Sequence, residues 1–396
     1  MDNERDSFLA AHISDIHVGA FDSEILYNEF KTVVINDTIK RLPFLDVIFI
    51  QGDFYHYELS LNGKHAWYSF KIFDDLKKAI KKKISKQKIP CKTKIRIIKG
   101  TKSHDHEQLE NLLYDDILDI KVINQVDVEY INGVKILYLP EEYIADPEEY
   151  YKPYFNDSYN YVIGHGMFEE TAFHNYNSEV NMEAAPVYNS EVISNICDFA
   201  CFGHIHNAYT FKNIHYTGSF SRWCYGEEDP KGFIISAFNK RNNNVVAMPV
   251  INHLARKFIT INIDNIIKNN DIDNILSYIE KYYDKNGIYK LRLMINERND
   301  SSFMGKVALV QNHFAYNRLI DIVIKRHNLD DDELDENENI IDKYNYLFDD
   351  TIDENTKISL FLKDSGYELS PHQVEELINC DILKLIDTMM DEYDDD

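Results

Sequence analysis

Short apolar segments recur through the first half of the chain, and this feature constrains its fold more than any other. Each segment is at most seven residues long and rich in Ile, Val, Phe and Tyr, and most end at Gly, Asp or His, which is typical of buried β-strands. The segments are FLAAHIS (8–14), DVIFIQ (46–51), KIRIIK (94–99), VKILYL (134–139), YNYVIG (159–164) and DFACFG (198–203). Two longer stretches with apolar residues at helical spacing, 23–40 and 64–86, separate the first three segments. This alternation predicts an α/β fold with a central sheet.

The pattern changes in the second half of the chain and divides it into regions. GFIISAF and VVAMPVI flank the polar turn RNNN and predict a β-hairpin at the end of a first domain, residues 1–255. Residues 256–327 alternate as β-α-β-α-β and predict a small α+β domain of about 70 residues. Residues 328–350 are too acidic to pack and predict a linker. Residues 351–396 predict a C-terminal segment whose amphipathic helix binds a partner.

The net charge of −25 is unevenly distributed along the chain. Residues 330–396 hold 23 Asp or Glu and four Lys, which leaves 44 acidic and 38 basic groups elsewhere. The stretch from Lys77 to Lys102 contains twelve Lys or Arg and no acid. Such a stretch is often a solvated helix face, but a phosphate backbone would relieve the repulsion between its charges. We predict that this stretch binds DNA through Lys81, Lys82, Lys83, Lys99 and Lys102.

Cysteine usage and hydropathy bear on the cellular compartment. The five cysteines are odd in number and contain no C-x-x-C pair, which argues against a disulfide framework or a zinc knuckle and favours free thiols in a reducing compartment. No apolar run reaches the length of a membrane span, and the polar start MDNERDS differs from a signal peptide. We therefore expect a cytoplasmic protein that does not associate with membranes.

Polar residues follow the predicted strands at the points where these strands end. They are Asp15 and His17 in SDIHVG, Asp53 and His56 in QGDFYH, Ser103, His104 and Asp105 in GTKSHDH, His165 in IGHG, and His204 and His206 in FGHIH. Because the carboxyl ends of strands in an α/β sheet converge on one edge, we expect these side chains to share a pocket. A single D-x-H arises by chance, and Gly-Asp is a common turn. Five such clusters, each after a predicted strand, indicate a functional site.

The composition of this set predicts a metal centre. Many unpaired imidazoles and carboxylates in one pocket would be costly to dehydrate unless a cation compensated them. Ligation by His and Asp without Cys suits Mn²⁺, Fe²⁺ or Zn²⁺ better than Mg²⁺ or a structural zinc ion. Two ions about 3.5–4 Å apart can share a carboxylate, activate a bridging water and neutralise a phosphoryl group. We therefore expect two divalent ions, with Mn²⁺ as the first choice and Fe²⁺, Zn²⁺ or Mg²⁺ as alternatives.

The order D-x-H, G-D, a Ser-His-Asp block, G-H and G-H-x-H resembles the motif series of the calcineurin-like metallophosphoesterase superfamily. More narrowly, HISDIHVG, GDFYH and GHIH resemble the SbcD-type DNA repair nucleases, relatives of the Mre-eleven subunit that include phage-encoded proteins. The motifs cover about residues 8–220. The resemblance implies a two-layered or sandwich-like core built of βαβ units, with central sheets flanked by helices. It also implies that residues 256–327 cap this core and that C-terminal helices follow.

The resemblance further implies a ligand set for two metal ions. The first ion would be held by Asp15, His17, Asp53 and His206. Asp53 would bridge to the second ion, whose other ligands would be His165, His204 and a residue of the third motif, for which Ser103 is the candidate.

The third motif departs from the family pattern. The family has Gly-Asn-His with the Asn amide oxygen as a ligand, whereas this chain has Gly-Thr-Lys-Ser-His-Asp at residues 100–105, two residues longer. Ser103 then stands at the Asn position, and its neutral hydroxyl is a poorer metal ligand than an amide oxygen. By the same resemblance, His104 would be the general acid for the departing sugar oxygen and His56 would lie near the phosphate. Asp105 would help His104 to hold its proton.

Three functions are compatible with these features. The first is a metal-dependent DNA exo- or endonuclease subunit that hydrolyses phosphodiester bonds by a two-metal mechanism with a bridging hydroxide. It would act as a homodimer with an SbcC-like SMC-family ATPase, bound through the C-terminal helices, in the cytoplasm of a bacterium or a phage-infected host. The second is a phosphatase or small-molecule phosphodiesterase of the same superfamily. The third is a catalytically weakened scaffold subunit. The basic stretch and the C-terminal helix favour the first, and the retained Asp and His residues count against the third.

Overall fold

The computed structural model describes residues 5–85, 93–112, 118–168, 187–285, 288–298 and 300–325. The predicted linker (328–350) and the predicted C-terminal segment (351–396) lie outside the described residues. The chain divides into two compact units. The first comprises Met1–Trp223 and Asp229–Ala255, and the second comprises Cys224–Glu228 and Arg256–Asp396.

One six-stranded mixed sheet of the first unit contains the first three predicted strands and the predicted hairpin. Its order is β14-β13-β1-β2-β3-β4, in which β1 to β4 are parallel and β13 and β14 are antiparallel. The strands are β1 (Ser7–Ile13), β2 (Val47–Gln51), β3 (Lys94–Ile98), β4 (Ile120–Ile123), β13 (Gly232–Asn239) and β14 (Asn244–Ile251). The parallel strands bring their carboxyl ends to one edge of this sheet.

A second six-stranded sheet contains the other three predicted strands. Its order is β11-β12-β10-β7-β6-β5, and its four central strands run parallel. The strands are β5 (Asp127–Ile131), β6 (Val134–Leu139), β7 (Tyr159–His165), β10 (Cys197–Gly203), β11 (Tyr209–Phe211) and β12 (Ile214–Tyr216). A short parallel pair, β8 (Met167–Phe168) and β9 (Val187–Tyr188), follows β7.

The two sheets pack face to face around an apolar core. Phe8 and Phe49 from the first sheet meet Tyr138, Tyr161 and Phe199 from the second, and all five are at most 2% exposed. Alternate residues of each strand supply this core, because successive side chains of a strand point to opposite faces of the sheet. The predicted sandwich-like α/β core is confirmed.

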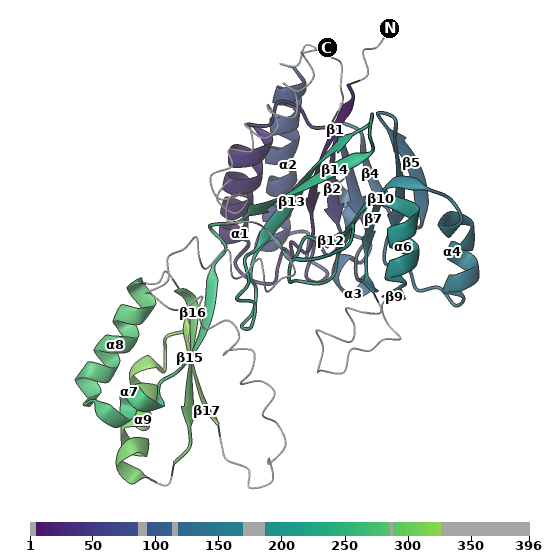
Figure 1. Cartoon of the computed structure of the whole chain (residues 1–396). Helices are drawn as coiled ribbons and strands as arrows, with labels where there is room; N and C mark the ends of the chain where they lie inside the picture. The colour runs from purple at the N-terminus through teal and green to yellow at the C-terminus, as the bar shows by residue number, and fades with distance from the viewer. Residues whose placement is uncertain are drawn as a thin grey trace. The chain divides into compact units, whose positions relative to one another are not determined.

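Helices cover the outer faces of the sandwich, with α1 and α2 on one side and α4 and α6 on the other (Figure 1). The main helices are α1 (Ser23–Phe30), α2 (Lys64–Ile84), α4 (Pro147–Phe155) and α6 (Ser190–Ile196). Asp22, Asp146 and Asn189 cap α1, α4 and α6 by accepting a hydrogen bond from a backbone N–H of the first turn. Two single turns, α3 (Lys102–Asp105) and η2 (Leu109–Leu112), follow β3.

The predicted helix at 23–40 changes its character halfway. It is α-helical to Phe30 and continues as a π-helix, η1 (Lys31–Ile39). Residues 32–35 are all β-branched, and such side chains crowd the turns of an α-helix. Thr38 Oγ1 also donates to Val33 O five residues earlier, at 2.9 Å.

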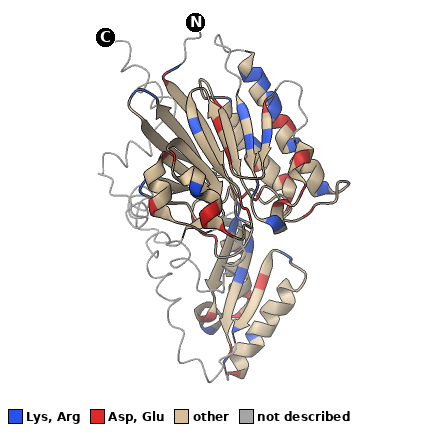
Figure 2. Cartoon of the chain, turned by 90° about the vertical axis from the view of Figure 1, so that its right-hand side faces the viewer, with Lys and Arg blue, Asp and Glu red and all other residues tan. Residues whose placement is uncertain are grey.

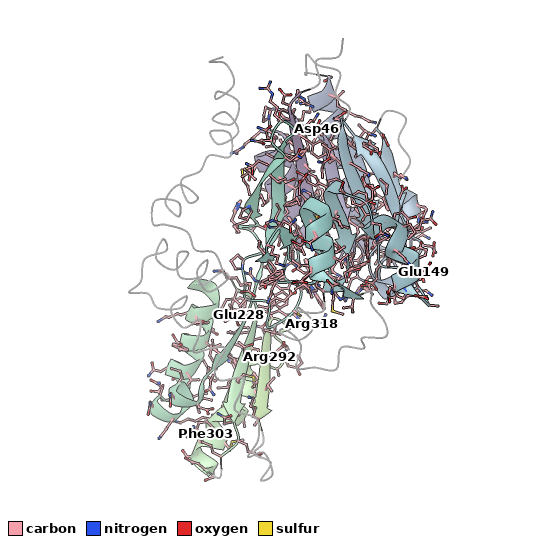
Figure 3. The ribbon with its side chains drawn as sticks, turned by 45° about the vertical axis from the view of Figure 1, so that its right-hand side comes forward. Asp46, Glu149, Glu228, Arg292, Phe303 and Arg318 are labelled. Carbon is pink, nitrogen blue, oxygen red and sulfur yellow. The ribbon has the colours of Figure 1, made fainter. Side chains whose placement is uncertain are left out.

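The second unit has the predicted β-α-β-α-β order around a parallel sheet, β15-β16-β17. Its elements are β15 (Lys257–Asn262), α7 (Asp264–Asn269), α8 (Ile272–Lys285), β16 (Ile288–Asn296), α9 (Ser301–Phe314) and β17 (Ile320–Lys325). The apolar sides of the helices pack on the sheet through residues such as Ile275 and Phe303, the second of which is labelled in Figure 3. The short helix α7 was not predicted. Within the described ranges, no helix combines the length and apolar character of a membrane span.

Candidate metal centre

The predicted site residues gather where the carboxyl ends of the parallel strands of both sheets meet. Three groups of side chains in this region could each hold a metal ion, because their ligand atoms lie within 4.8 Å of one another. The groups are Asp15, His17 and His206, then Asp53, His165 and His204, and then His17, His56 and His104. The first two groups each combine residues from both sheets, so the site exists only when the sandwich is formed.

The first group is centred on the Asp15 carboxylate. Asp15 Oδ1 lies 3.8 Å from His206 Nε2 and 4.0 Å from His17 Nε2. The two imidazole nitrogens are 3.1 Å apart, so each ring aims Nε2 into the same space. Both carboxylate oxygens of Asp15 also accept the backbone N–H of His204 at 3.1 Å, which ties this group to the second.

The second group surrounds Asp53 Oδ2. His165 Nε2 lies 3.4 Å from this oxygen. On the far side of its ring, His165 Nδ1 donates to Gln51 O at 2.8 Å, which directs Nε2 toward the carboxylates. Asp53 Oδ1 accepts the backbone N–H of Thr101 at 2.7 Å, which connects the ends of β2 and β3.

Four of the predicted ligands have left-handed backbone conformations. Their φ angles are 48° at Asp15, 51° at His17, 48° at Asp53 and 96° at His204. Such angles are uncommon outside glycine and cluster at functional sites, where the surrounding structure holds them against their conformational cost. The strand ends therefore turn sharply to aim these side chains at one another.

Two glycines allow the backbone to approach this closely. A Cβ at Gly52, whose φ is +79°, would lie 2.1 Å from His165 Nδ1. A Cβ at Gly100 would lie 2.3 Å from the backbone nitrogen of Asp53. Both distances are far inside van der Waals contact, so a larger residue at either position would displace a ligand of the second group.

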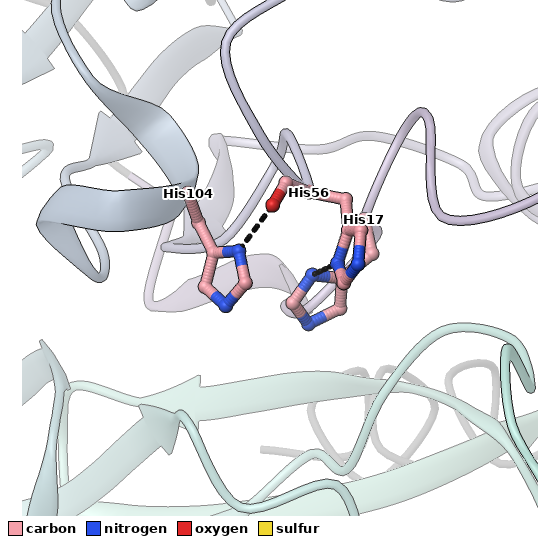
Figure 4. A group of neighbouring side chains, drawn as sticks. All are labelled: His17, His56 and His104. Carbon is pink, nitrogen blue, oxygen red and sulfur yellow. Dashed lines mark hydrogen bonds between the residues drawn. The ribbon is translucent and has the colours of Figure 1, made fainter.

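His104 and His56 lie beside the first group, as Figure 4 shows. His104 Nδ1 donates to the backbone carbonyl of His56, and His56 Nδ1 lies 3.4 Å from His17 Nδ1. Because a carbonyl only accepts, His104 carries a proton on Nδ1 and directs Nε2 toward Asp53 Oδ2, 4.0 Å away. This orientation brings the predicted general acid to the ligand groups.

The structure corrects two predictions about the third motif. Ser103 is exposed on α3, and no described hydrogen bond joins its hydroxyl to a ligand group, whereas the Thr101 hydroxyl lies 3.2 Å from Asp53 Oδ2. Asp105 is fully buried and accepts the backbone N–H groups of Gly100, Asp53 and Tyr55 at 2.9–3.1 Å. Among the described hydrogen bonds, none joins Asp105 to His104. Asp105 therefore holds the loops after β2 and β3 together and does not assist His104.

Burial and neighbouring charges set the protonation of the groups. Burial lowers the pKa of His17 well below its ordinary value and, together with the nearby His165, lowers the pKa of His204 to about 3. Burial acts in the same direction on His165, but the carboxylates around it, Asp53 first, raise its pKa well above the ordinary value. His17 and His204 are thus neutral at pH 7 and have lone pairs to offer, while the carboxylates attract positive charge.

The donor set fits a metal ion. His165 Nε2 and His204 Nδ1 are buried and have no hydrogen-bond partner among the described residues. Histidine nitrogens lie within 4.0 Å of the Asp15 and Asp53 carboxylates, and among the described residues no Lys or Arg pairs with either of them. The raised pKa of His165 gives these carboxylates a single positive charge, and a divalent ion would compensate the remaining negative charge and bind the two unpaired nitrogens. Mixed nitrogen and oxygen ligands without sulfur suit Mn²⁺, Fe²⁺ or Zn²⁺.

The predicted DNA-binding lysines do not form a uniform group. Lys83 is half-buried, and its ammonium donates to the backbone carbonyls of Ile39 and Leu42 at the end of η1. Burial lowers the pKa of Lys83 to about 8, so this residue belongs to the packing of the helices. Lys99 pairs with Glu107 at 3.2 Å, whereas Lys82 and Lys102 are exposed.

The basic stretch as a whole is partly neutralised by acids from other segments. Lys78 pairs with Asp74, and Lys94 and Arg96 pair with Glu129. Unrelieved repulsion between the twelve charges was therefore a wrong expectation for these residues. Figure 2 shows Lys and Arg segments interspersed with Asp and Glu segments over the strands and helices of the first unit. Residues 86–92 of the stretch lie outside the described part of the chain.

Three residues outside the predicted ligand set line the candidate centre. Thr101 bonds to Asp53, and the Trp223 indole N–H donates to His206 Nδ1 at 3.2 Å. Glu141 Oε2 lies 3.7 Å from His165 Nε2. Glu141 follows the strand segment VKILYL after a single proline, so the rule that found the other ligands, a polar residue after an apolar strand, would also have selected it.

Comparison with known proteins adds no assignment: no protein-family model matches the chain, and no curated protein has a significantly similar sequence.

Proposed function

We propose that the chain is a metal-dependent phosphodiesterase and that DNA is its substrate. The observation that carries the proposal is the adjacency of two buried ligand groups, Asp15-His17-His206 and Asp53-His165-His204, at the carboxyl ends of strands from both sheets. Two ions, Mn²⁺ in first place, would be held by these groups, with Asp53 as the bridging ligand. When bound, such ions activate a water and stabilise the charge on a phosphoryl group.

The histidines beside the ligand groups supply the other parts of the reaction. His104 keeps its Nδ1 proton on the His56 carbonyl, so its Nε2 is the atom that can carry a proton to the departing sugar oxygen. His56, which lies against both His17 and His104, would position the phosphate. The buried histidines His17 and His204 stay neutral, which keeps their lone pairs available at pH 7.

The substrate proposal rests on the basic stretch, the resemblance to SbcD-type nucleases and the predicted partner. Lys81, Lys82 and Lys102 remain as candidates for phosphate contacts. The predicted homodimer, the ATPase partner and the cytoplasmic location belong to this proposal, as does a capping role for the second unit. The helix predicted to bind the ATPase lies outside the described residues.

A second candidate is a phosphatase or small-molecule phosphodiesterase with the same centre. It is favoured by the ion pairs of Lys78, Lys94, Arg96 and Lys99, which weaken the case for a long polyanionic substrate. Both candidates require the same ions and differ in the leaving group and in the size of the substrate.

The test compares substrates and metals on the full chain. Labelled linear duplex DNA, single-stranded DNA, bis-nitrophenyl phosphate and nitrophenyl phosphate are each incubated with Mn²⁺ or with EDTA. The proposal expects Mn²⁺-dependent cleavage of DNA and of the diester. Hydrolysis of the monoester alone would favour the phosphatase, and the absence of any Mn²⁺-dependent hydrolysis would reject both candidates.

A further inference from the structure

Glu141 lies beside the second ligand group of the candidate centre, although it is not one of the predicted ligands. It follows β6 and Pro140, and its backbone N–H donates to Lys99 O at 3.1 Å, which joins the ends of β6 and β3 from the two sheets. Its side chain is fully buried. Neither sheet alone would place this carboxylate beside the second ligand group.

The Glu141 carboxylate faces two nitrogens that lack partners. Its Oε2 lies 3.7 Å from His165 Nε2 and 3.6 Å from His204 Nδ1. Both nitrogens are buried and make no hydrogen bond to any described residue. Two unpaired nitrogens and a carboxylate oxygen that converge at this spacing leave room for an ion between them, whereas direct hydrogen bonds would bring them to about 2.7–3.2 Å.

The hydrogen bonds around Glu141 leave part of its charge uncompensated. Tyr143 donates its hydroxyl to Oε1, and Thr101 Oγ1 lies 3.1 Å from Oε2. The same Thr101 oxygen lies 3.2 Å from Asp53 Oδ2, but a hydroxyl has one proton and can donate to only one of these carboxylates. In the described chain, imidazole nitrogens of His165 and His204 lie within 4.0 Å of the Glu141 carboxylate, and no Lys or Arg pairs with it. Two carboxylates that share one hydroxyl in a buried site leave negative charge that a cation would compensate.

We propose that Glu141 is a metal ligand, which completes the second site as Asp53, Glu141, His165 and His204. This inference rests on the proposed metal-dependent function and specifies its second ion. The second ligand group supplies three side chains, one fewer than the four or more ligands that divalent ions take, and Ser103 is exposed on α3. Glu141, which follows β6, supplies the missing oxygen. Because it is negatively charged, it attracts a divalent ion more strongly than a neutral hydroxyl or amide would.

The experiment titrates metal-free full-length protein with Mn²⁺ and follows free Mn²⁺ by its electron paramagnetic resonance signal. The wild type should bind two ions. Glu141→Gln should weaken one binding step by at least about tenfold and leave the other unchanged, because loss of outer-sphere partners alone costs about 10–100-fold in metal affinity. Glu142→Gln is the matched control: this neighbouring carboxylate bonds to Val126 N and to Tyr150, outside the ligand groups.

Thermal melting separates a ligand from a structural residue. In EDTA, Glu141→Gln should melt at the same temperature as the wild type or higher, because a neutral amide is easier to bury than an uncompensated carboxylate. Added Mn²⁺ should then raise the melting temperature of the variant less than that of the wild type.

Each other outcome has a defined meaning. If Glu141→Gln binds both ions as the wild type does, or fails to fold in EDTA where the wild type folds, Glu141 is a structural residue and the inference is rejected alone. If the wild type itself binds no Mn²⁺, the proposed function is rejected together with the inference.

Discussion

The first unit has two clusters of charged side chains where its sheets meet, and they differ in how many of their charged groups find partners within the cluster. In the first, Arg96 on β3 donates from Nε and Nη2 to both oxygens of Glu129 on β5, at 2.7 and 2.6 Å. Lys94 and the Tyr138 hydroxyl also donate to Glu129, and Arg96 Nη1 pairs with Asp119 at 2.9 Å. In the second, the candidate metal centre, His165 and His204 have unpaired nitrogens, and no Lys or Arg of the described ranges pairs with the carboxylates.

The difference indicates what each cluster is for. In the first cluster the charged groups find partners within the protein. It therefore links the two sheets and needs no bound ion. The second cluster has unpaired nitrogens, left-handed backbone conformations and excess negative charge. Such a cluster needs a bound cation to satisfy its groups. Asp46, labelled in Figure 3, belongs to the first kind, because it accepts bonds from Arg5, Leu9 N and Asn132.

The largest effect is expected at Asp53. Asp53→Asn should reduce Mn²⁺-dependent hydrolysis by about 10³-fold or more, because metal stabilisation of the transition state is worth several kcal/mol and an amide cannot bridge two ions. Steady-state rates on DNA and on bis-nitrophenyl phosphate provide the measurement. Asp46→Asn is the control, since it should lower stability and leave the rate per folded molecule unchanged. Full activity of Asp53→Asn would remove the distinction between the two clusters.

The next largest effect concerns His104. If His104 is the general acid, His104→Ala should reduce DNA cleavage by about 10²–10⁴-fold. The same change should cost less than about tenfold on bis-nitrophenyl phosphate, whose leaving group departs without a proton. Mn²⁺ content should not change, and His106→Ala on the same turn serves as the control. Equal losses on both substrates with reduced Mn²⁺ content would instead make His104 a ligand.

In the Arg96–Glu129 cluster we expect substitutions to lower the free energy of unfolding without lowering the rate of hydrolysis. Arg96→Met should lower the free energy of unfolding by about 3–5 kcal/mol, because it leaves Glu129 without its main partner in a largely buried site. The double variant Arg96→Met/Glu129→Gln should recover part of this loss, since it removes both charges. Urea unfolding at pH 7 measures both. This account would be contradicted if the double variant lost more unfolding free energy than the two single variants lose together.

The pH dependence of stability should show the contribution of Glu129 in the Arg96–Glu129 cluster. Burial acts to raise the pKa of Glu129, but the bonds from Arg96 and Lys94 outweigh it and lower this pKa from 4.5 to about 2. A carboxylate whose pKa is lowered by folding stabilises the protein above pH 4.5, and this contribution is lost as the pH falls from 4.5 toward 2. The difference in stability between wild type and Glu129→Gln should therefore shrink over that interval. A constant difference would show that the ion pair contributes nothing to stability.

The smallest effects are expected among the lysines, and they sharpen the same contrast. Lys81→Gln/Lys82→Gln should reduce the slope of log affinity for DNA against log salt by about 0.7–0.9 for each lost phosphate contact. Lys83→Gln should leave that slope unchanged and lower stability instead, because Lys83 bonds to the end of η1. Equal slopes for the wild type and the double variant would mean that Lys81 and Lys82 lie outside the DNA path.

Most of the framework could be read from the chain because it depends on local patterns. The six apolar runs all form strands, and the β-α-β-α-β order of the second unit is present. Asp15, Asp53 and His165 could be selected as candidate ligands because each stands at the end of a strand. The π-helical half of the segment at 23–40 was missed, since periodicity does not separate α from π turns over so short a stretch.

What only the tertiary structure decided are the contacts between residues distant in sequence. The sequence placed Ser103 as a ligand and Asp105 as a partner of His104. In the folded chain Ser103 is exposed, and the Asp105 carboxylate accepts hydrogen bonds from backbone N–H groups of two loops. Likewise, the Lys-rich stretch has no acid in sequence, yet Glu129 reaches Lys94 and Arg96 from the other sheet.

The sequence by itself determined which residue types stand at the ends of the strands, because strands and their ends are set by patterns of a few residues. The stacking of two separately hydrogen-bonded sheets decided which of those ends meet. That stacking places Glu141 from β6 opposite Asp53 from β2, and it depends on core contacts such as Phe49 against Tyr138, which no local pattern encodes.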